Sequence, residues 1–205
     1  MKADVATASW LALGTTLAGL VLGGTGLWLG VSDGCIALWG FGGASLLQVP
    51  PALSLRGRIQ DGLGNSGLER ERLTLKTVSL LLRFLALGMA MASVSALLGE
   101  RSPQSSPFTL GLALLALGLQ AALWFAKRGL AELHLALDLD GARARTLLEL
   151  SALLLAGSLL GRWFPWADAI TSLALALRLF LEGRSLAKAS TLQAAACGGC
   201  GGGCH

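Results

Sequence analysis

The last nine residues of the chain hold four side chains that bind soft metal ions, namely Cys197, Cys200, Cys204 and His205. Three thiolates and an imidazole form an accepted zinc set, and thiolates also favour copper(I). The residues between them are all glycines, which would let so short a segment close around an ion. We predict a transition-metal site here, with zinc as the first choice and copper(I) as the second. The alternative is a glycine-rich tail whose thiols bind nothing specific.

A second set of candidates is polar side chains within or beside apolar stretches: Gln48, Asp140 and Glu149. A carboxylate inside an apolar run is costly in a membrane and often marks a transport pathway. Glu149 is the most informative of the three, and two interpretations stay open. It could bind a transported cation, or it could pair with Arg145 four residues earlier and merely allow the helix to insert. Arg178 is a further candidate partner for this carboxylate.

The remaining acids and the histidine have simpler interpretations. Asp168 opens an apolar run, where the positive end of the helix dipole favours a carboxylate, and Asp33 precedes another. We expect both to be capping residues. His134 lies in a charged segment and is expected at the surface. No Ser/His/Asp set and no phosphate-binding glycine loop is present, so we do not expect an enzyme.

The composition is that of a membrane protein. Hydrophobic residues make up 54% of the 205 residues and charged residues only 14%, whereas soluble domains carry about 25% charged residues. The mean hydropathy is +0.66. A chain with so few charges cannot cover its own surface with polar groups. We therefore expect the lipid bilayer as its surroundings.

Several apolar runs approach the ~20 residues that a membrane-spanning helix needs. We predict an all-α polytopic protein whose six transmembrane helices cover about residues 10–29, 35–55, 75–98, 108–125, 147–160 and 167–181. The last two form a hairpin around Pro165, with Trp163 and Trp166 at the membrane interface. Pro50 and Pro51 should kink or end the second helix.

Glycines recur four residues apart in and after the first helix, as Gly19–Gly23, Gly26–Gly30 and Gly30–Gly34. This spacing lets two helices approach closely in lipid. Glycine is also common in membrane helices generally, and the sequence leaves both interpretations open.

The basic residues predict the orientation. Most of the 16 Lys and Arg residues lie near the N-terminus, in the 56–76 and 127–145 links, and after residue 183. Basic residues accumulate on the cytoplasmic side of a membrane protein. We predict six spans with both termini cytoplasmic, in a bacterial inner membrane. This placement also explains the net charge of +4 without nucleic acid as a partner.

These helices and their motifs resemble the cation diffusion facilitator family of metal transporters. The second helix of that family reads roughly S-x-A-L-L-A-D-A-x-H-S-x-x-D, and residues 35–48 read CIALWGFGGASLLQ. The fifth helix reads roughly L-x-A-D-A-x-H-x-x-x-D, against LDLDGARARTL at 137–147. The sixth opens with an Asp and ends near a Gly, as Asp168 and Gly183 do here. The resemblance implies six helices, transport of a divalent metal cation and, in many members, a dimer.

The motifs of this chain are degenerate at the ligand positions that the resemblance implies. The helix-two pair falls on Ala44 and Gln48, and the helix-five pair falls on Arg143 and Leu147. None of these is a good zinc ligand, and an arginine would repel the ion. We divide the chain into a six-helix transmembrane domain, 1–190, and a flexible Cys/Gly-rich tail, 191–205. The cytoplasmic domain that commonly follows in the family is not expected.

Two functions remain open from the sequence. The first is a carrier of divalent or transition-metal cations, with proton exchange as an option, whose site is rebuilt from Gln48, Asp140 and Glu149. The second is a transport-inactive relative that serves as a metal-binding or structural membrane subunit. Either could work as a homodimer or with a partner membrane subunit.

Overall fold

The computed structural model describes residues 2–60, 68–99, 107–129 and 135–198. Within these ranges the chain is all-helical and contains no strand, which confirms the predicted fold class. The helices are α1 (Lys2–Asp33), α2 (Ile36–Leu47), α3 (Val49–Gln60), α4 (Leu68–Leu98), α5 (Pro107–Arg128), α6 (Leu135–Leu160) and α7 (Ala167–Gly198).

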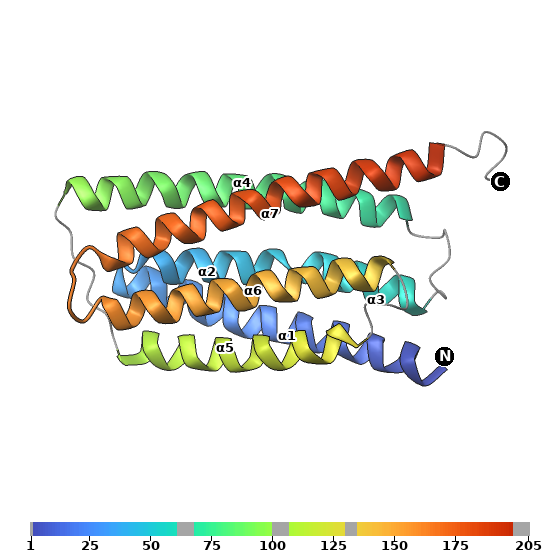
Figure 1. Cartoon of the computed structure of the whole chain (residues 1–205), viewed down its shortest axis with the longest axis horizontal. Helices are drawn as coiled ribbons and strands as arrows, with labels where there is room; N and C mark the ends of the chain where they lie inside the picture. The colour runs from blue at the N-terminus through green and yellow to red at the C-terminus, as the bar shows by residue number, and fades with distance from the viewer. Residues whose placement is uncertain (1, 61–67, 100–106, 130–134, 199–205) are drawn as a thin grey trace.

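The helices lie along the long axis of one bundle, and both ends of the chain lie at the same end of it (Figure 1). Large apolar side chains such as Trp28, Met91 and Leu98 are exposed on its outside. Helices that are apolar on all sides fit a hydrocarbon environment. The interior is also apolar, and its fully buried side chains include Leu22, Leu38, Phe41, Leu75, Met89, Leu147, Leu150, Leu154, Leu175 and Leu179.

Four helical segments are long and apolar enough to cross a membrane: Ala6–Asp33, Ile36–Gln60, Glu69–Leu98 and Phe108–Arg128. They confirm four of the six predicted spans. α6 and α7 lie in the same bundle but carry too many charged side chains for the same criterion. Membrane crossing by these two helices stays a prediction.

The second predicted helix is broken where the prolines indicated. α2 ends at Leu47, Gln48 is its C-terminal cap, and α3 begins at Val49. Pro50 and Pro51 have no N–H to continue the hydrogen-bond ladder back into α2, but they are tolerated in the first turn of α3. The two helices therefore follow one another with a discontinuity at Gln48.

The prediction that residues 127–145 form a link before the fifth helix was wrong for most of that range. α6 begins at Leu135 and includes most of that charged segment. Leu137, Ala144 and Leu147 are all buried, so the segment has an apolar face at helical spacing as well as charges. For a similar reason α4 begins at Leu68, seven residues before the predicted start.

α7 is also longer than predicted. It continues to Gly198, past the proposed domain boundary at 190 and into the segment predicted as a flexible tail. Of the four predicted metal ligands, Cys197 lies in the last turn of this helix. Cys200, Cys204 and His205 lie outside the described residues, as does His134.

Candidate functional site

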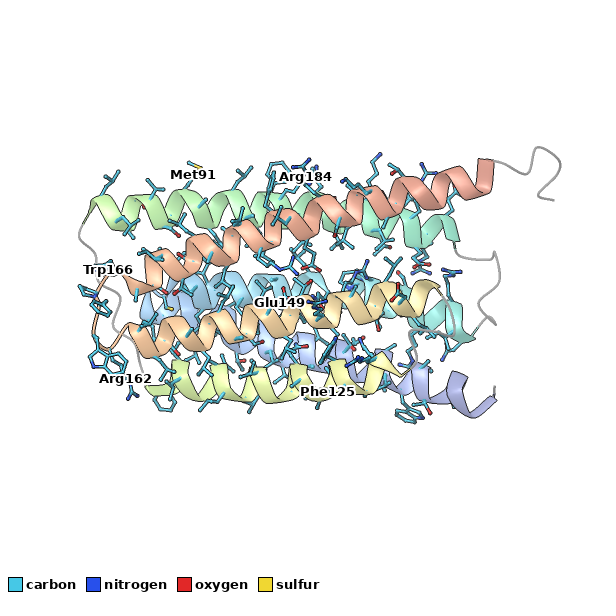
Figure 2. All side chains as sticks on the ribbon, viewed as in Figure 1. Met91, Phe125, Glu149, Arg162, Trp166 and Arg184 are labelled. Atoms are coloured by element: carbon cyan, nitrogen blue, oxygen red, sulfur yellow. The ribbon has the colours of Figure 1, made fainter. Side chains whose placement is uncertain are left out.

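Glu149 lies on α6 between two arginines, and both partners considered from the sequence are in contact with it. Arg145 Nε donates to Oε1 at 3.1 Å. Arg178, from α7, approaches Oε2 with Nε at 2.6 Å and Nη2 at 2.5 Å. The carboxylate therefore ties α6 to α7 as well as to its own helix. Figure 2 shows it in the middle part of the bundle.

Asp140 faces a different helix. Its carboxylate lies 2.6 Å from the ammonium of Lys127 on α5, and the two side chains are only 10% and 4% exposed. An ion pair this deeply buried is stable only while both partners are present, since either charge alone would be left without compensation. The pair fixes the ends of α5 and α6 to each other.

The three predicted transport residues do not form one site. Asp140 and Glu149 are nine residues apart on α6, which puts them on opposite faces and roughly 13 Å apart along the axis. Gln48 is buried at the end of α2. Among the described residues, no group of three His, Cys, Asp or Glu side chains is placed to hold a metal ion.

Two buried carboxylates escaped the sequence analysis. Glu182 on α7 is 5% exposed, and its Oε2 has no hydrogen-bond partner within the described residues. Glu71 on α4 forms a buried ion pair with Arg58 on α3. Glu182 follows Arg178 by one helical turn at the end of an apolar run, the same signal that singled out Glu149. The predicted sixth helix ends at residue 181, so the sequence places Glu182 just outside it.

Arg143 lies among these acids. Its guanidinium interacts electrostatically with Asp140, Glu182 and Glu71, which come from three helices. Its Nε is buried without a hydrogen-bond partner in the described part of the chain. The position that the family resemblance assigned to a metal ligand therefore holds a cation of the protein itself, close to carboxylates from α4, α6 and α7.

At the opposite end of the bundle, Asp168 caps a helix other than its own. Its carboxylate accepts hydrogen bonds from the backbone N–H groups of Ile36, at 3.0 Å, and Ala37, at 3.3 Å, at the start of α2. The Cys35 thiol donates to the same carboxylate at 3.0 Å. The capping interpretation thus needs correction, because Asp168 lies in the first turn of α7 but its hydrogen bonds go to α2.

Burial and the neighbouring Asp168 carboxylate raise the pKa of the Cys35 thiol well above its usual range. The group is therefore a hydrogen-bond donor at neutral pH and not a thiolate ligand. Asp33 has a similar linking role, since Thr109 Oγ1 on α5 lies 3.4 Å from its Oδ2 at the end of α1. At this end of the bundle, hydrogen bonds therefore join α7 to α2 and α5 to α1.

The comparison with known families identifies the chain. The cation efflux transmembrane domain matches residues 69–193, more than half of the sequence and the whole of α5 and α6 with most of α4 and α7. No curated protein matches. The matched segment carries Arg143, Glu149 and Glu182, whereas α1 to α3 lie before it. The chain is an integral membrane protein and belongs to the cation efflux transporter family.

Proposed function

We propose that this protein carries a divalent or transition-metal cation across the membrane in exchange for protons, with zinc as the first candidate. Family membership supports cation transport in general. The observation that carries the finer proposal is the group of acids around Arg143, because carboxylates from three helices interact with this one guanidinium. Carboxylates suit zinc as well as harder divalent ions.

Glu182 is the acid best placed to exchange one cation for another. Its Oε2 has no hydrogen-bond partner in the described residues, while Arg143 and Arg178 supply the positive charge around it. A metal cation entering between α6 and α7 would bind the Glu182 carboxylate and replace the Arg143 guanidinium as its counter-charge. Asp140 or Glu149 would join it after release from Lys127 or Arg178. When the metal leaves, protonation would neutralise the buried carboxylate, which is the step that couples transport to protons.

The C-terminal thiols serve the same transport in this proposal. Cys197, Cys200, Cys204 and His205 would bind the ion beside the cytoplasmic mouth and raise its local concentration there. α1 begins and α7 ends at the same end of the bundle, which supports a common compartment for the two termini (Figure 1). Copper(I) is the second candidate ion because three of the four ligands are thiolates.

A transport-inactive metal-binding subunit is the second candidate. The observation in its favour is that Asp140 and Glu149 both have basic partners and that an arginine stands among the acids. A bundle already neutralised by its own side chains would need no metal. In that case the tail alone would bind the ion, and the membrane part would present it to a partner subunit or to a second copy of the chain.

Flux into proteoliposomes separates these functions. Zinc, cobalt, nickel, iron(II) and copper(I) would be tested with and without a pH gradient. The proteins would be the full chain, a chain ending at Ala196, Glu182→Gln, Glu149→Gln and, as a control, Glu69→Gln, whose side chain is exposed on α4. We expect saturable flux that falls at least tenfold in Glu182→Gln and is unchanged in Glu69→Gln.

Removal of the tail should lower flux at low metal concentration and leave the maximal rate unchanged, because a delivery device affects capture only. Absence of flux for every ion, together with stoichiometric metal binding that requires the tail, would rule out the carrier and leave the subunit. Flux that is the same in Glu182→Gln as in the unmodified protein would exclude the route between α6 and α7.

A further inference from the structure

A groove of about 330 Å³ lies between α3 and α4 at the end of the bundle that holds the chain termini. Its volume is at the lower end of the roughly 300–1,000 Å³ that is typical of small-molecule sites. The lining side chains repeat at helical spacing on one face of α3, opposite the first two turns of α4. They are Pro50, Leu53, Ser54, Gly57, Arg58, Arg70 and Thr74.

Among the described residues, the groove has one positive charge without an ion-pair partner, that of Arg70. Arg58 is neutralised by its buried ion pair with Glu71, whereas the Arg70 side chain is exposed in the first turn of α4. Its neighbour Glu69 points about 100° away around the helix and so does not face it. The N-terminal turn of α4 adds backbone N–H groups that favour an anion. The charge and the helix end together select a negatively charged ligand.

The polarity of the groove changes with depth. α3 runs outward to the end of the candidate span Ile36–Gln60, and α4 begins at the start of the span Glu69–Leu98. Arg70 and Gly57 therefore lie at the membrane edge, while Pro50 and Leu53 lie roughly 6–10 Å deeper along α3. The hydroxyls of Ser54 and Thr74, 3.4 Å apart, lie between these two levels. The order charged, hydroxylic, apolar is that of a phospholipid from headgroup to acyl chain.

We propose that this groove binds an anionic phospholipid. The headgroup phosphate pairs with Arg70 and accepts a hydrogen bond from Ser54, whose hydroxyl turns away from Thr74 to do so, because the Thr74 hydroxyl already donates to the Arg70 carbonyl at 2.8 Å. The upper part of an acyl chain packs on Pro50 and Leu53. Basic pockets between membrane helices are recurrent sites for such headgroups. The lipid would fill the space beside the break at Gln48 and so hold α3 against α4. This inference does not depend on which ion the protein transports.

Gly57 offers a direct test because a side chain there would meet open space in the groove. Gly57→Leu should fill the site and leave every charge in place. Gly88→Leu is the matched control, since a side chain at that exposed position on α4 also meets nothing within 4 Å. Arg70→Gln removes the charge, and Arg72→Gln removes an exposed charge of the same helix that does not line the groove.

Delipidated protein in a neutral detergent would be titrated with phosphatidylglycerol, phosphatidylcholine or inorganic phosphate, and binding would be followed by native mass spectrometry. We expect phosphatidylglycerol to bind at least tenfold more tightly than phosphatidylcholine. Gly57→Leu should weaken phosphatidylglycerol binding at least tenfold and Arg70→Gln at least fivefold. Gly88→Leu and Arg72→Gln should bind like the unmodified protein.

Equal binding of the two lipids, or unchanged binding in both Gly57→Leu and Arg70→Gln, would overturn the proposal. Competition by millimolar inorganic phosphate that removes all bound lipid would show a site for a free anion and not for a lipid. If Gly57→Leu does not fold, Arg70→Gln decides the result alone, because its side chain is exposed and its loss leaves the packing unchanged.

Discussion

Two helix pairs in this bundle are held together in opposite ways. α1 and α2 meet backbone to backbone through glycines, and a Cβ atom on Gly42 would lie 2.5 Å from the backbone nitrogen of Leu27. α4 and α7 meet through polar side chains. Ser79 donates to the carbonyl of Gly183 at 2.8 Å, Arg83 donates to the same oxygen at 3.3 Å, and Ser93 pairs with Ser172.

The glycine spacing noted in the sequence thus has a packing role within one chain. Gly19, Gly23, Gly26 and Gly30 all lie against α2, with atoms of that helix at or inside van der Waals contact of an added Cβ. Gly34 is different, since it has a φ of +67° and nothing near it, and it serves the turn between the helices. The partner of this face is α2 of the same chain.

The two kinds of helix contact lie on opposite sides of residue 69, where the family match begins. α1 and α2 precede residue 69, and their contact leaves no room for a side chain at Gly42, Gly30 or Gly23. α4 and α7 lie largely within the matched segment and are joined by the hydrogen bonds of Ser79, Arg83 and Ser93. Close contacts occur in this half as well, since a Cβ atom on Gly183 would lie 3.0 Å from the carbonyl oxygen of Ser79. The two helix pairs therefore differ in the hydrogen bonds that α4 and α7 add, and not in an absence of close packing.

The largest expected effect is from Gly42→Leu, which forces a side chain into the backbone of α1. Overpacking of this kind typically costs about 1–3 kcal/mol, and more where backbone has to move. We expect a loss of more than about 5 kcal/mol, measured by unfolding in detergent. Gly24→Ala is the control, because its Cβ meets nothing within 4 Å and should raise stability slightly. A tolerated Gly42→Leu would show that the α1–α2 contact is not steric.

Lys127→Met tests whether loss of a buried ion pair between α5 and α6 lowers the free energy of unfolding as much as a side chain forced into the glycine contact does. It leaves the carboxylate of Asp140 buried and unpaired, so we expect a loss of about 3–5 kcal/mol. The double variant Lys127→Met with Asp140→Leu should recover most of it, and the same unfolding measurement checks both. Equal losses in the single and double variants would mean that the ion pair is not what the single variant removes.

Asp168→Ala tests the contact that joins the two halves, since it removes the cap of α2 that α7 provides. We expect a loss of about 1–2 kcal/mol. In a chain ending at Ala196, which lacks the three tail cysteines, the raised pKa keeps Cys35 protonated, so a maleimide should label it far more slowly at pH 8 than a cysteine placed at exposed Ser95. Without the carboxylate the pKa falls towards its ordinary value, and labelling should become faster. Labelling of the unmodified protein as fast as at position 95 would contradict the burial of the thiol.

The smallest expected effect is from Ser93→Ala, which removes one hydrogen bond between α4 and α7. Such bonds contribute about 0.6 kcal/mol on average in membrane proteins. Ser95→Ala is the control, because its hydroxyl bonds only to the backbone of its own helix. A loss as large as that of Gly42→Leu would remove the distinction between the two interfaces.

The sequence predicted what depends on composition and local geometry. Apolar length indicated the four confirmed spans, the prolines indicated the break at Gln48, and the i, i+4 spacing indicated the Arg145–Glu149 pair. What it did not predict depends on how the helices are rotated against one another. The Lys127–Asp140 pair, the Asp168 cap on α2 and the acids around Arg143 all join separate helices. A pattern within one helix does not predict which face of that helix will pack against another.

α7 is longer than the hydrocarbon core of a bilayer is thick. A helix of 32 residues is about 48 Å long, whereas the hydrocarbon core of a bilayer is about 30 Å thick. If α7 crosses the bilayer as predicted, starting beside Trp163 and Trp166, it has more than three turns left over beyond the hydrocarbon core. Its last turn, which includes Cys197, would then lie outside the hydrocarbon core. An ion in water could reach that turn without entering the hydrocarbon.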